Sequence, residues 1–414
     1  MTDSPIFLSL VTILATSQVL ARLLRRLGQP PVVGEIIAGF VLGPIVLGAL
    51  WPDTHARLFS HSVSAGLSAI ASLGVVLFTF AVGVEVRQSK DAPLQWNGAA
   101  CVGLCSVLVP FSLGVAIAPV VYPTMAPTTA GHWPFALFLG TALSVTALPV
   151  LARIVKDRGM AGTKVGQLAL GAAAAADVLS WGLLLVVVSI AGANNAPGRL
   201  GLGHALAGLA TLCLVLACVV RPIVAGTLKS QAPGEYPSLP FMAGLLIGLF
   251  VCAEVTEWLG LHRVFGAFLF GVALPQDERL ARAVSRSVEP LAIVVLMPVF
   301  FALAGLSTTP DAFASHSMLL LVLLLSVAIA SKLAGGVVGA RLVGLGWRDS
   351  LTVGTLLNAR GLMEIVVIKV GLDAGLIRGE LFTILLFMAV ATTAMTGPLI
   401  AWLREKQIPI AQRG

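Results

Sequence analysis

Charged residues are scarce in this chain. Lys, Arg, Asp and Glu make up 11% of its 414 residues, whereas 57% are hydrophobic. A soluble domain carries about 25% charged residues, so a soluble enzyme, a nucleic-acid-binding protein and a disordered scaffold are excluded. The composition predicts a polytopic membrane protein, for which the lipid bilayer is the main solvent.

Cysteines are few, and motifs for enzymatic chemistry are lacking. The five cysteines lie inside apolar runs without a Cys-x-x-Cys pair or a cluster with histidine. We expect neither disulfides nor a metal site from them, and we interpret the thiols as small buried packing residues. No Gly-x-Gly-x-x-Gly unit, Walker motif or catalytic-triad spacing occurs. We therefore expect no enzyme, no cofactor and no ATP-driven pump, which leaves a secondary transporter or a channel.

Long apolar runs fill the sequence instead. Their length and uniform hydropathy predict transmembrane helices rather than barrel strands. We expect thirteen such helices, over residues 6–26, 31–50, 64–86, 95–121, 133–156, 164–193, 201–228, 238–258, 261–275, 289–306, 316–343, 350–373 and 381–403.

The loop charges predict the orientation of these helices. With the N-terminus outside, the inner side carries 19 of the 26 Lys and Arg residues, and the outer side carries four. Positive residues favour the cytoplasmic side, so the short tail 404–414 is expected in the cytoplasm. The net charge of +7 then reflects topology rather than binding to nucleic acid. Because no basic residue precedes the first run, we expect no cleavable signal peptide, and we expect no soluble nucleotide-binding domain.

Asp177 is the most informative residue, because it is predicted at mid-depth in the helix over 164–193. Five alanines precede it and allow close helix approach. Ionisable groups are costly in hydrocarbon and are functional candidates by default. Asp177 is therefore predicted to hold a proton or to coordinate a monovalent cation, and the alternative is a structural carboxylate paired to a neighbouring helix.

Two predicted helices are interrupted at corresponding places. Pro149 follows Ser144 and Thr146 in the fifth segment, and a polar stretch over 357–361 interrupts the twelfth. Interrupted helices in corresponding positions indicate a transporter site at the midplane. With 201–228 as a linker, the first six and last six helices form two inverted repeats. The alternative is a plain proline kink and a polar packing patch.

Further charges are predicted at the same depth. Arg360 and Glu364 are four residues apart and share a helix face, either as an ion pair that only holds helices together or with a direct role in transport. Lys332 lies too deep to reach the surface, and we expect it to face Asp177 or the ends of the interrupted helices. Glu35, one turn inside the second helix, is a candidate for an inner vestibule.

Six motifs are spread over about residues 29–403: Gln29–Pro44, Ala142–Arg153, Gly266–Gly271, Met297–Ala302, Leu357–Glu364 and Thr392–Pro398. Together they resemble the second monovalent cation:proton antiporter family, which includes bacterial Na+(K+)/H+ exchangers, plant cation/H+ exchangers and potassium efflux antiporters. The likeness covers almost the whole chain.

The resemblance implies roles for individual residues. The ion-binding aspartate of the family matches Asp177, with a monovalent cation bound there, and its helix-crossing hydroxyls match Ser144 and Thr146. Its core lysine matches Lys332, and its second helix crossing matches 358–361, which begins with Asn358 and includes Arg360. The residue before the aspartate, often Asp, Asn or Gln in the family, is Ala176 here.

The resemblance also implies an architecture. The family fold is an all-α sodium/proton antiporter fold with crossed broken helices in one transmembrane domain, here 1–403. It would divide the chain into a core over about 95–193 and 316–403, a dimerisation scaffold over about 6–86 and 238–306, and the linker helix. Family members are homodimers whose core slides against the scaffold. No glutathione or nucleotide gating is expected, because the cytosolic regulatory domain of the potassium efflux proteins has no counterpart here.

These observations predict an antiporter of the bacterial inner membrane that exchanges Na+ or K+ for H+ by alternating access. Exchange is expected to be electroneutral, because Ala176 cannot bind a second proton. Two alternatives stay open: a proton-coupled exporter of an organic molecule, for which the alanines beside Asp177 leave room, and a cation channel or ion sensor.

Overall fold

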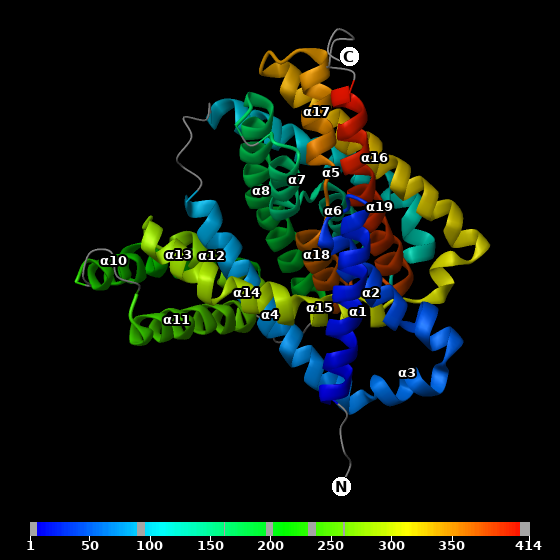
Figure 1. Cartoon of the computed structure of the whole chain (residues 1–414), viewed down its shortest axis with the longest axis horizontal. Helices are drawn as coiled ribbons and strands as arrows, with labels where there is room; N and C mark the ends of the chain where they lie inside the picture. Colours follow the sequence, from blue (N-terminus) through cyan, green and yellow to red (C-terminus); the bar gives the residue numbers. More distant parts are fainter. Residues whose placement is uncertain are drawn as a thin grey trace. The chain divides into compact units, whose positions relative to one another are not determined.

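The computed structural model describes residues 6–88, 96–160, 162–195, 202–230, 237–259 and 261–405. This part of the chain is helical throughout and contains no strand (Figure 1). The α-helices are α1 (Ile6–Arg26), α2 (Pro31–Leu42), α3 (Pro52–Leu58), α4 (His61–Gln88), α5 (Trp96–Met125), α6 (His132–Ser144), α7 (Leu148–Asp157), α8 (Lys164–Asn195), α9 (Leu202–Val215), α10 (Arg221–Lys229), α11 (Leu239–Trp258), α12 (Arg263–Ala273), α13 (Glu278–Ser287), α14 (Glu289–Leu291), α15 (Met297–Leu306), α16 (Ser315–Leu342), α17 (Trp347–Leu357), α18 (Leu362–Asp373) and α19 (Gly379–Glu405). Short π-helical segments are η1 (Pro44–Gly48), η2 (Leu216–Val220) and η3 (Ala292–Leu296), and η4 (Pro310–Phe313) is a 3-10 turn.

Ten helical stretches in the described residues are long and apolar enough to cross a membrane. The prediction of an all-helical, multi-pass membrane protein is therefore confirmed. The three other predicted segments correspond to shorter helices: 261–275 is α12, and 133–156 and 350–373 are each split into two, as α6 with α7 and α17 with α18. The total of thirteen membrane-spanning helices stays a prediction.

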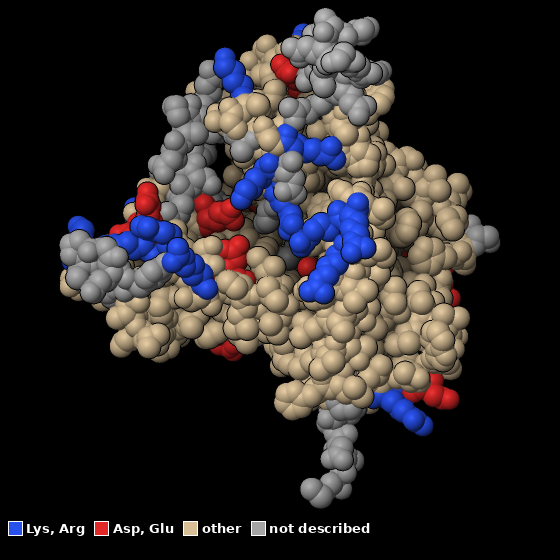
Figure 2. Space-filling view, viewed as in Figure 1, with Lys and Arg blue, Asp and Glu red and all other residues tan. Residues whose placement is uncertain are grey.

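The surface agrees with a lipid environment. Most of the surface visible in Figure 2 is neither acidic nor basic, and large apolar side chains such as Leu239, Phe7 and Trp258 are exposed. This explains one wrong expectation from the sequence. Cys213 and Cys218 are exposed rather than buried, because a lipid-facing helix surface is as apolar as a packed one.

Two short helices were missed by the sequence analysis. These are α3 and α13, which lie in segments taken as loops. In α13, Leu280 and Val284 are buried while Arg282 and Arg286 are exposed. An amphipathic helix of this kind is too polar to be recognised as a membrane span.

The chain divides into two compact units. Unit 1 comprises 1–14, 57–92 and 188–303, and unit 2 comprises 15–56, 93–187 and 304–414. In unit 1, α12 packs on α4 and α11. A Cβ atom at Gly266 would lie only 2.1 Å from the carbonyl oxygen of Cys252, so glycine is required where α12 meets α11.

In unit 2, α5 packs on α6 and α16, and α16 packs on α17. Glycines allow this close packing, since a Cβ atom at Gly114 would lie 2.6 Å from the Cα of Gly140, and one at Gly336 would lie 2.6 Å from the Cα of Gly354. Small residues let membrane helices approach closely. The four glycines bring α5 against α6 and α16 against α17, and α6 and α17 are the first halves of the two interrupted helices.

Candidate functional site

Both interrupted helices break inside unit 2, and the breaks contact each other. Helix α6 ends at Ser144 and α7 begins at Leu148. Pro149 lies in the first turn of α7, where its missing N–H is tolerated. The N–H of Ala147, in the first break, donates to the carbonyl of Ala359, in the second, at 3.2 Å. The two breaks therefore cross at one point.

Gly361 makes this crossing compact. A Cβ atom at this position would lie 2.8 Å from Cγ2 of Val150 and 3.6 Å from Cβ of Ala147. A larger residue in the break between α17 and α18 would push α7 away. The glycine is thus explained by the close approach of the two broken helices.

Lys332 lies at the C-terminal end of α6. It is fully buried on α16, and its Nζ donates to the carbonyls of Ser144, the last residue of α6, and Ser106, at 3.0 Å for the latter. The last carbonyls of a helix carry partial negative charge. From the sequence, Lys332 is expected to face either Asp177 or the ends of the interrupted helices. In the structure its hydrogen bonds go to the end of one interrupted helix, α6, and to Ser106.

Arg360 binds the same helix end from the other break. Its guanidinium donates to the carbonyls of Ala142 and Leu143, at 3.2 and 2.7 Å, and pairs with Glu364 at 2.8 Å. Arg360 and Glu364 are both fully buried. Two cations, Lys332 and Arg360, therefore balance the partial negative charge at the C-terminus of α6.

The break before α18 is also fixed by α19. The N–H of Arg360 donates to the hydroxyl of Thr393 at 3.1 Å, and this hydroxyl donates to the carbonyl of Arg360. Glu364 lies in the first turn of α18, where the helix dipole stabilises a carboxylate. The sequence analysis gave Thr393 no role. Two signals pointed to it, its place in the motif Thr392–Pro398 and its position in the middle of an apolar helix.

Asp177 is buried on α8, with 1% of its surface exposed. Asp177 and Glu364 both lie close enough to Lys332 for their negative charges to attract its ammonium group. Asp177 therefore shares one electrostatic environment with the crossing.

The alanines before Asp177 are used for packing. A Cβ atom at Gly103 of α5 would lie 2.7 Å from the carbonyl oxygen of Ala172 and 2.9 Å from Cβ of Ala175. Helix α5 thus approaches α8 as closely as the backbones allow. Ala172 and Ala175 therefore pack against α5.

Two polar side chains at the breaks lack hydrogen-bond partners within the described part of the chain. They are Thr146, through its hydroxyl, and Asn358, through both atoms of its amide, and both residues are fully buried. Each directly precedes one of the two residues, Ala147 and Ala359, that join the breaks. Buried polar groups are nearly always bonded, so each exception calls for an explanation.

The remaining predicted residues have other surroundings. The Ser144 hydroxyl donates to the carbonyl of Thr141 at 2.8 Å, which leaves its oxygen able to accept. Glu35 is half-buried on α2, where the charge of Arg153 acts on it. The role of Glu35 in an inner vestibule stays a prediction.

The comparison with known families agrees with this geometry. The model of the transmembrane sodium/hydrogen exchanger family matches residues 10–406. The chain belongs to this family. It is 32% identical over 403 residues to the Na(+)/H(+) antiporter NhaS4 of Synechocystis, a match that covers 95% of this chain and 96% of the relative.

Other members of the exchanger family differ in length or in sequence. Cation/H(+) antiporter 17 of Arabidopsis thaliana is 34% identical over 399 residues, which is 95% of this chain and 48% of the plant protein, so the chain spans about half the length of that relative. The solved structure of a sodium/proton antiporter from Methanocaldococcus jannaschii has a TM-score of 0.65 at 15% identity, and the match covers 97% of this chain and 98% of that structure. The fold is therefore that of a sodium/proton antiporter.

Proposed function

We propose that this chain is a secondary transporter rather than an enzyme, and that it exchanges one monovalent cation, Na+ or K+, for one proton by alternating access. Membership of the exchanger family supports the reaction class. The observation that carries the proposal is the crossing, where the polar atoms of Thr146 and Asn358 lie beside a buried charge cluster that includes Asp177. In this proposal Asp177 holds either the proton or the cation.

The ligand types fit a small cation. A carboxylate from Asp177, a hydroxyl oxygen from Thr146 and an amide oxygen from Asn358 are all oxygen donors, and hard cations prefer oxygen ligands. A cation bound there would be ligated by two oxygens that have no other partner, the hydroxyl oxygen of Thr146 and Oδ1 of Asn358; Nδ2 of Asn358 is a donor and would not bind it. Ser144 contributes through its carbonyl, which positions Lys332.

The charges explain why exchange would be electroneutral. With Asp177 and Glu364 ionised, they balance Lys332 and Arg360. Binding either a proton or a monovalent cation at Asp177 adds one positive charge to this cluster. Both loaded states then carry the same charge, so a full cycle moves none across the membrane. The empty state moves less readily, because an ionised carboxylate is costly to keep away from water and ions.

The orientation, assembly and location complete the proposal. The Lys and Arg distribution supports an N-terminus outside and a C-terminus in the cytoplasm of a bacterial cell. We also propose a homodimer in which a core with the crossing moves against a scaffold. The tight contact between α5 and the alanines of α8 favours an inorganic cation over an organic substrate.

The test is Asp177→Asn in proteoliposomes with an internal pH dye. Asparagine keeps the size of the side chain and removes the titratable charge. Addition of Na+, K+ or Li+ should move protons in the wild type and not in this variant. Asp311→Asn, the same change at an exposed residue, is the control and should exchange normally. Near-normal exchange by a correctly folded Asp177→Asn variant would refute the assignment.

A further inference from the structure

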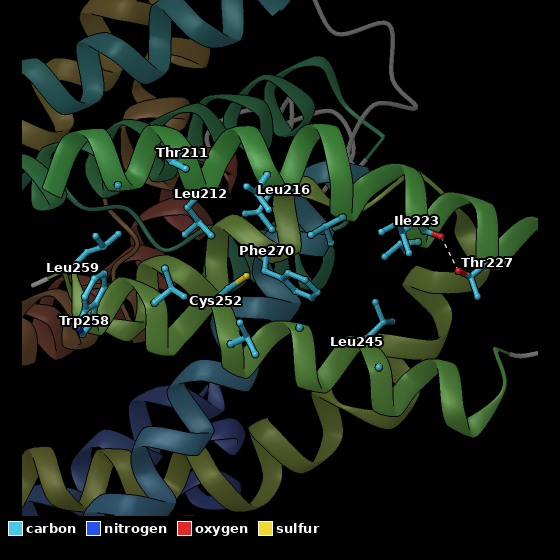
Figure 3. Close-up of a pocket in the computed structure, with 18 of the residues that line it drawn as sticks. Thr211, Leu212, Leu216, Ile223, Thr227, Leu245, Cys252, Trp258, Leu259 and Phe270 are labelled. Carbon is cyan, nitrogen blue, oxygen red and sulfur yellow. Dashed lines mark hydrogen bonds between the residues drawn. The ribbon is translucent and has the colours of Figure 1, made fainter. Parts of the chain in front are cut away.

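A long apolar groove lies on unit 1, and none of the candidate site residues of unit 2 lines it. Helices α9, η2 and α10 form one wall, α11 forms the other, and Phe270 of α12 lies between them (Figure 3). Its volume is about 720 Å³. The lining residues extend from Gly208 to Thr227 along the first wall, which is roughly 28 Å of helix. This length is close to the hydrocarbon thickness of a bilayer, about 30 Å.

The groove offers nothing for a polar ligand to bind. Its two threonines are satisfied by their own helix, since the hydroxyl of Thr211 donates to Ala207 at 2.8 Å and that of Thr227 donates to Ile223 at 2.7 Å (Figure 3). The other lining groups are almost all aliphatic or aromatic. An occupant must therefore be hydrocarbon over the length of the groove.

One end of the groove is basic. Helices α10 and α13 together carry five Lys and Arg residues against two acidic residues, Glu278 and the N-cap Asp277, which pair with Arg282 and Arg279. The guanidinium of Arg279, at the start of α13, donates to the carbonyl of Leu228 at 3.4 Å, which places α13 beside the end of the groove at Thr227. Lys229 is exposed on the same turn of α10. Figure 2 shows basic side chains over this part of the molecule.

We propose that this groove binds an anionic phospholipid, with an acyl chain between α10 and α11 and the headgroup phosphate at Lys229 and the arginines of α13. Hydrocarbon matches the lining, and an anion matches the basic end. A second copy of the chain fits less well. A twofold axis along the membrane normal keeps each residue at its own depth, so the basic ends of the two copies would meet and repel.

Two glycines provide a matched pair of variants. Gly244 lines the groove at the α10 end, and Gly226 lies outside it. A Cβ atom at either position meets nothing within 4 Å. Both can therefore be changed to leucine without a clash at Cβ, and only Gly244→Leu puts a side chain into the groove.

The experiment measures the melting midpoint of the purified full-length protein in detergent while phosphatidylglycerol is added. Phosphatidylcholine with the same chains and glycerol 3-phosphate without chains are the comparison ligands. We expect phosphatidylglycerol to raise the midpoint of the wild type and of Gly226→Leu, but not that of Gly244→Leu. Lys229→Gln should raise the concentration for half the effect about fivefold, and Lys164→Gln, on another helix, should not.

Two results would overturn the proposal. One is a Gly244→Leu variant that responds to phosphatidylglycerol like the wild type. The other is an equal response to phosphatidylcholine that Lys229→Gln leaves unchanged. A change of oligomeric mass in Gly244→Leu with an intact lipid response would show instead that the groove contacts a second copy.

A second measurement needs no variant. Phosphatidylglycerol with a photoreactive acyl chain is cross-linked to the wild type, and the labelled peptides are mapped. Label on α10 and α11 supports the proposal, and label spread evenly over all lipid-facing helices contradicts it.

Discussion

Replacing Glu364 by Gln tests what the buried ion pair contributes to the helix crossing. Glutamine keeps the size of the side chain and can still accept a hydrogen bond from Arg360, but it removes the negative charge. The pair is 2.8 Å apart and neither side chain is exposed. Removing the charge of one partner in a buried ion pair lowers the free energy of unfolding by about 3 kcal/mol, because the charge of the other partner stays buried and uncompensated. We expect Glu364→Gln to lower the free energy of unfolding by about this amount.

The double variant Arg360→Met with Glu364→Met gives the matching comparison. Removing both charges of a buried pair together is often neutral. What remains is the loss of the donors to the carbonyls of Ala142 and Leu143. At about 1 kcal/mol for each lost hydrogen bond, the double variant should lose about 2 kcal/mol. It should therefore be more stable than Glu364→Gln alone.

The assay is unfolding in mixed micelles with increasing dodecyl sulfate, followed by exchange measurements in proteoliposomes. Asp373→Asn is the control, because Lys369 and Asp373 form a pair with the same spacing and the same 2.8 Å distance but are partly exposed. We expect it to change stability by less than about 1 kcal/mol. A Glu364→Gln variant as stable as the wild type would refute the reasoning, as would a double variant less stable than the single one.

The same variants separate two roles of the pair. If Arg360 and Glu364 only hold the helices together, the double variant keeps cation-induced proton movement. If Glu364 binds a transported proton, exchange is lost although stability is partly restored.

Three further predictions follow from the site and from α13. Thr146→Val and Asn358→Leu should each weaken the apparent affinity for the cation about fivefold, as expected for one lost neutral ligand. Thr141→Val is the control and should not change the affinity. An unchanged affinity in all three variants would show that Thr146 and Asn358 only pack. Valinomycin with equal K+ on both sides clamps the membrane potential at zero and should leave the rate of Na+-driven proton movement unchanged, whereas faster movement with valinomycin would contradict electroneutral exchange. The third concerns Asp277, the N-cap of α13, whose carboxylate accepts from the N–H of Arg279 at 2.8 Å: partial burial raises its pKa, but the hydrogen bonds and charge of Arg279 outweigh this and lower the pKa overall. A lowered carboxylate pKa stabilises the fold above the unfolded pKa of about 3.9, and this stabilisation is lost as the pH falls through the folded pKa. Between pH 6 and pH 3 the melting temperature should therefore fall less in Asp277→Asn, which keeps a capping side chain, than in the wild type. An equal fall in both proteins would exclude this role of Asp277.

Local sequence patterns determined the spans and the positions of the breaks. The first helix is Ile6–Arg26, as its apolar run indicates, and α8 is Lys164–Asn195 against a prediction of 164–193. Pro149 and the polar stretch around Asn358 mark the two breaks. These features depend on hydropathy, on the missing N–H of proline and on residues close in the chain, so the sequence is sufficient to find them.

The partners of the buried charges depended on the tertiary structure. Lys332 bonds to the carbonyls of Ser144 and Ser106, which are 188 and 226 residues away in the chain. A uniformly apolar helix has no polar face that would indicate which side meets its neighbours. For the same reason the sequence did not distinguish buried Cys252 from exposed Cys213. Only the packed helices decide which carbonyls a buried cation reaches, because those carbonyls belong to a helix end that another segment has brought there.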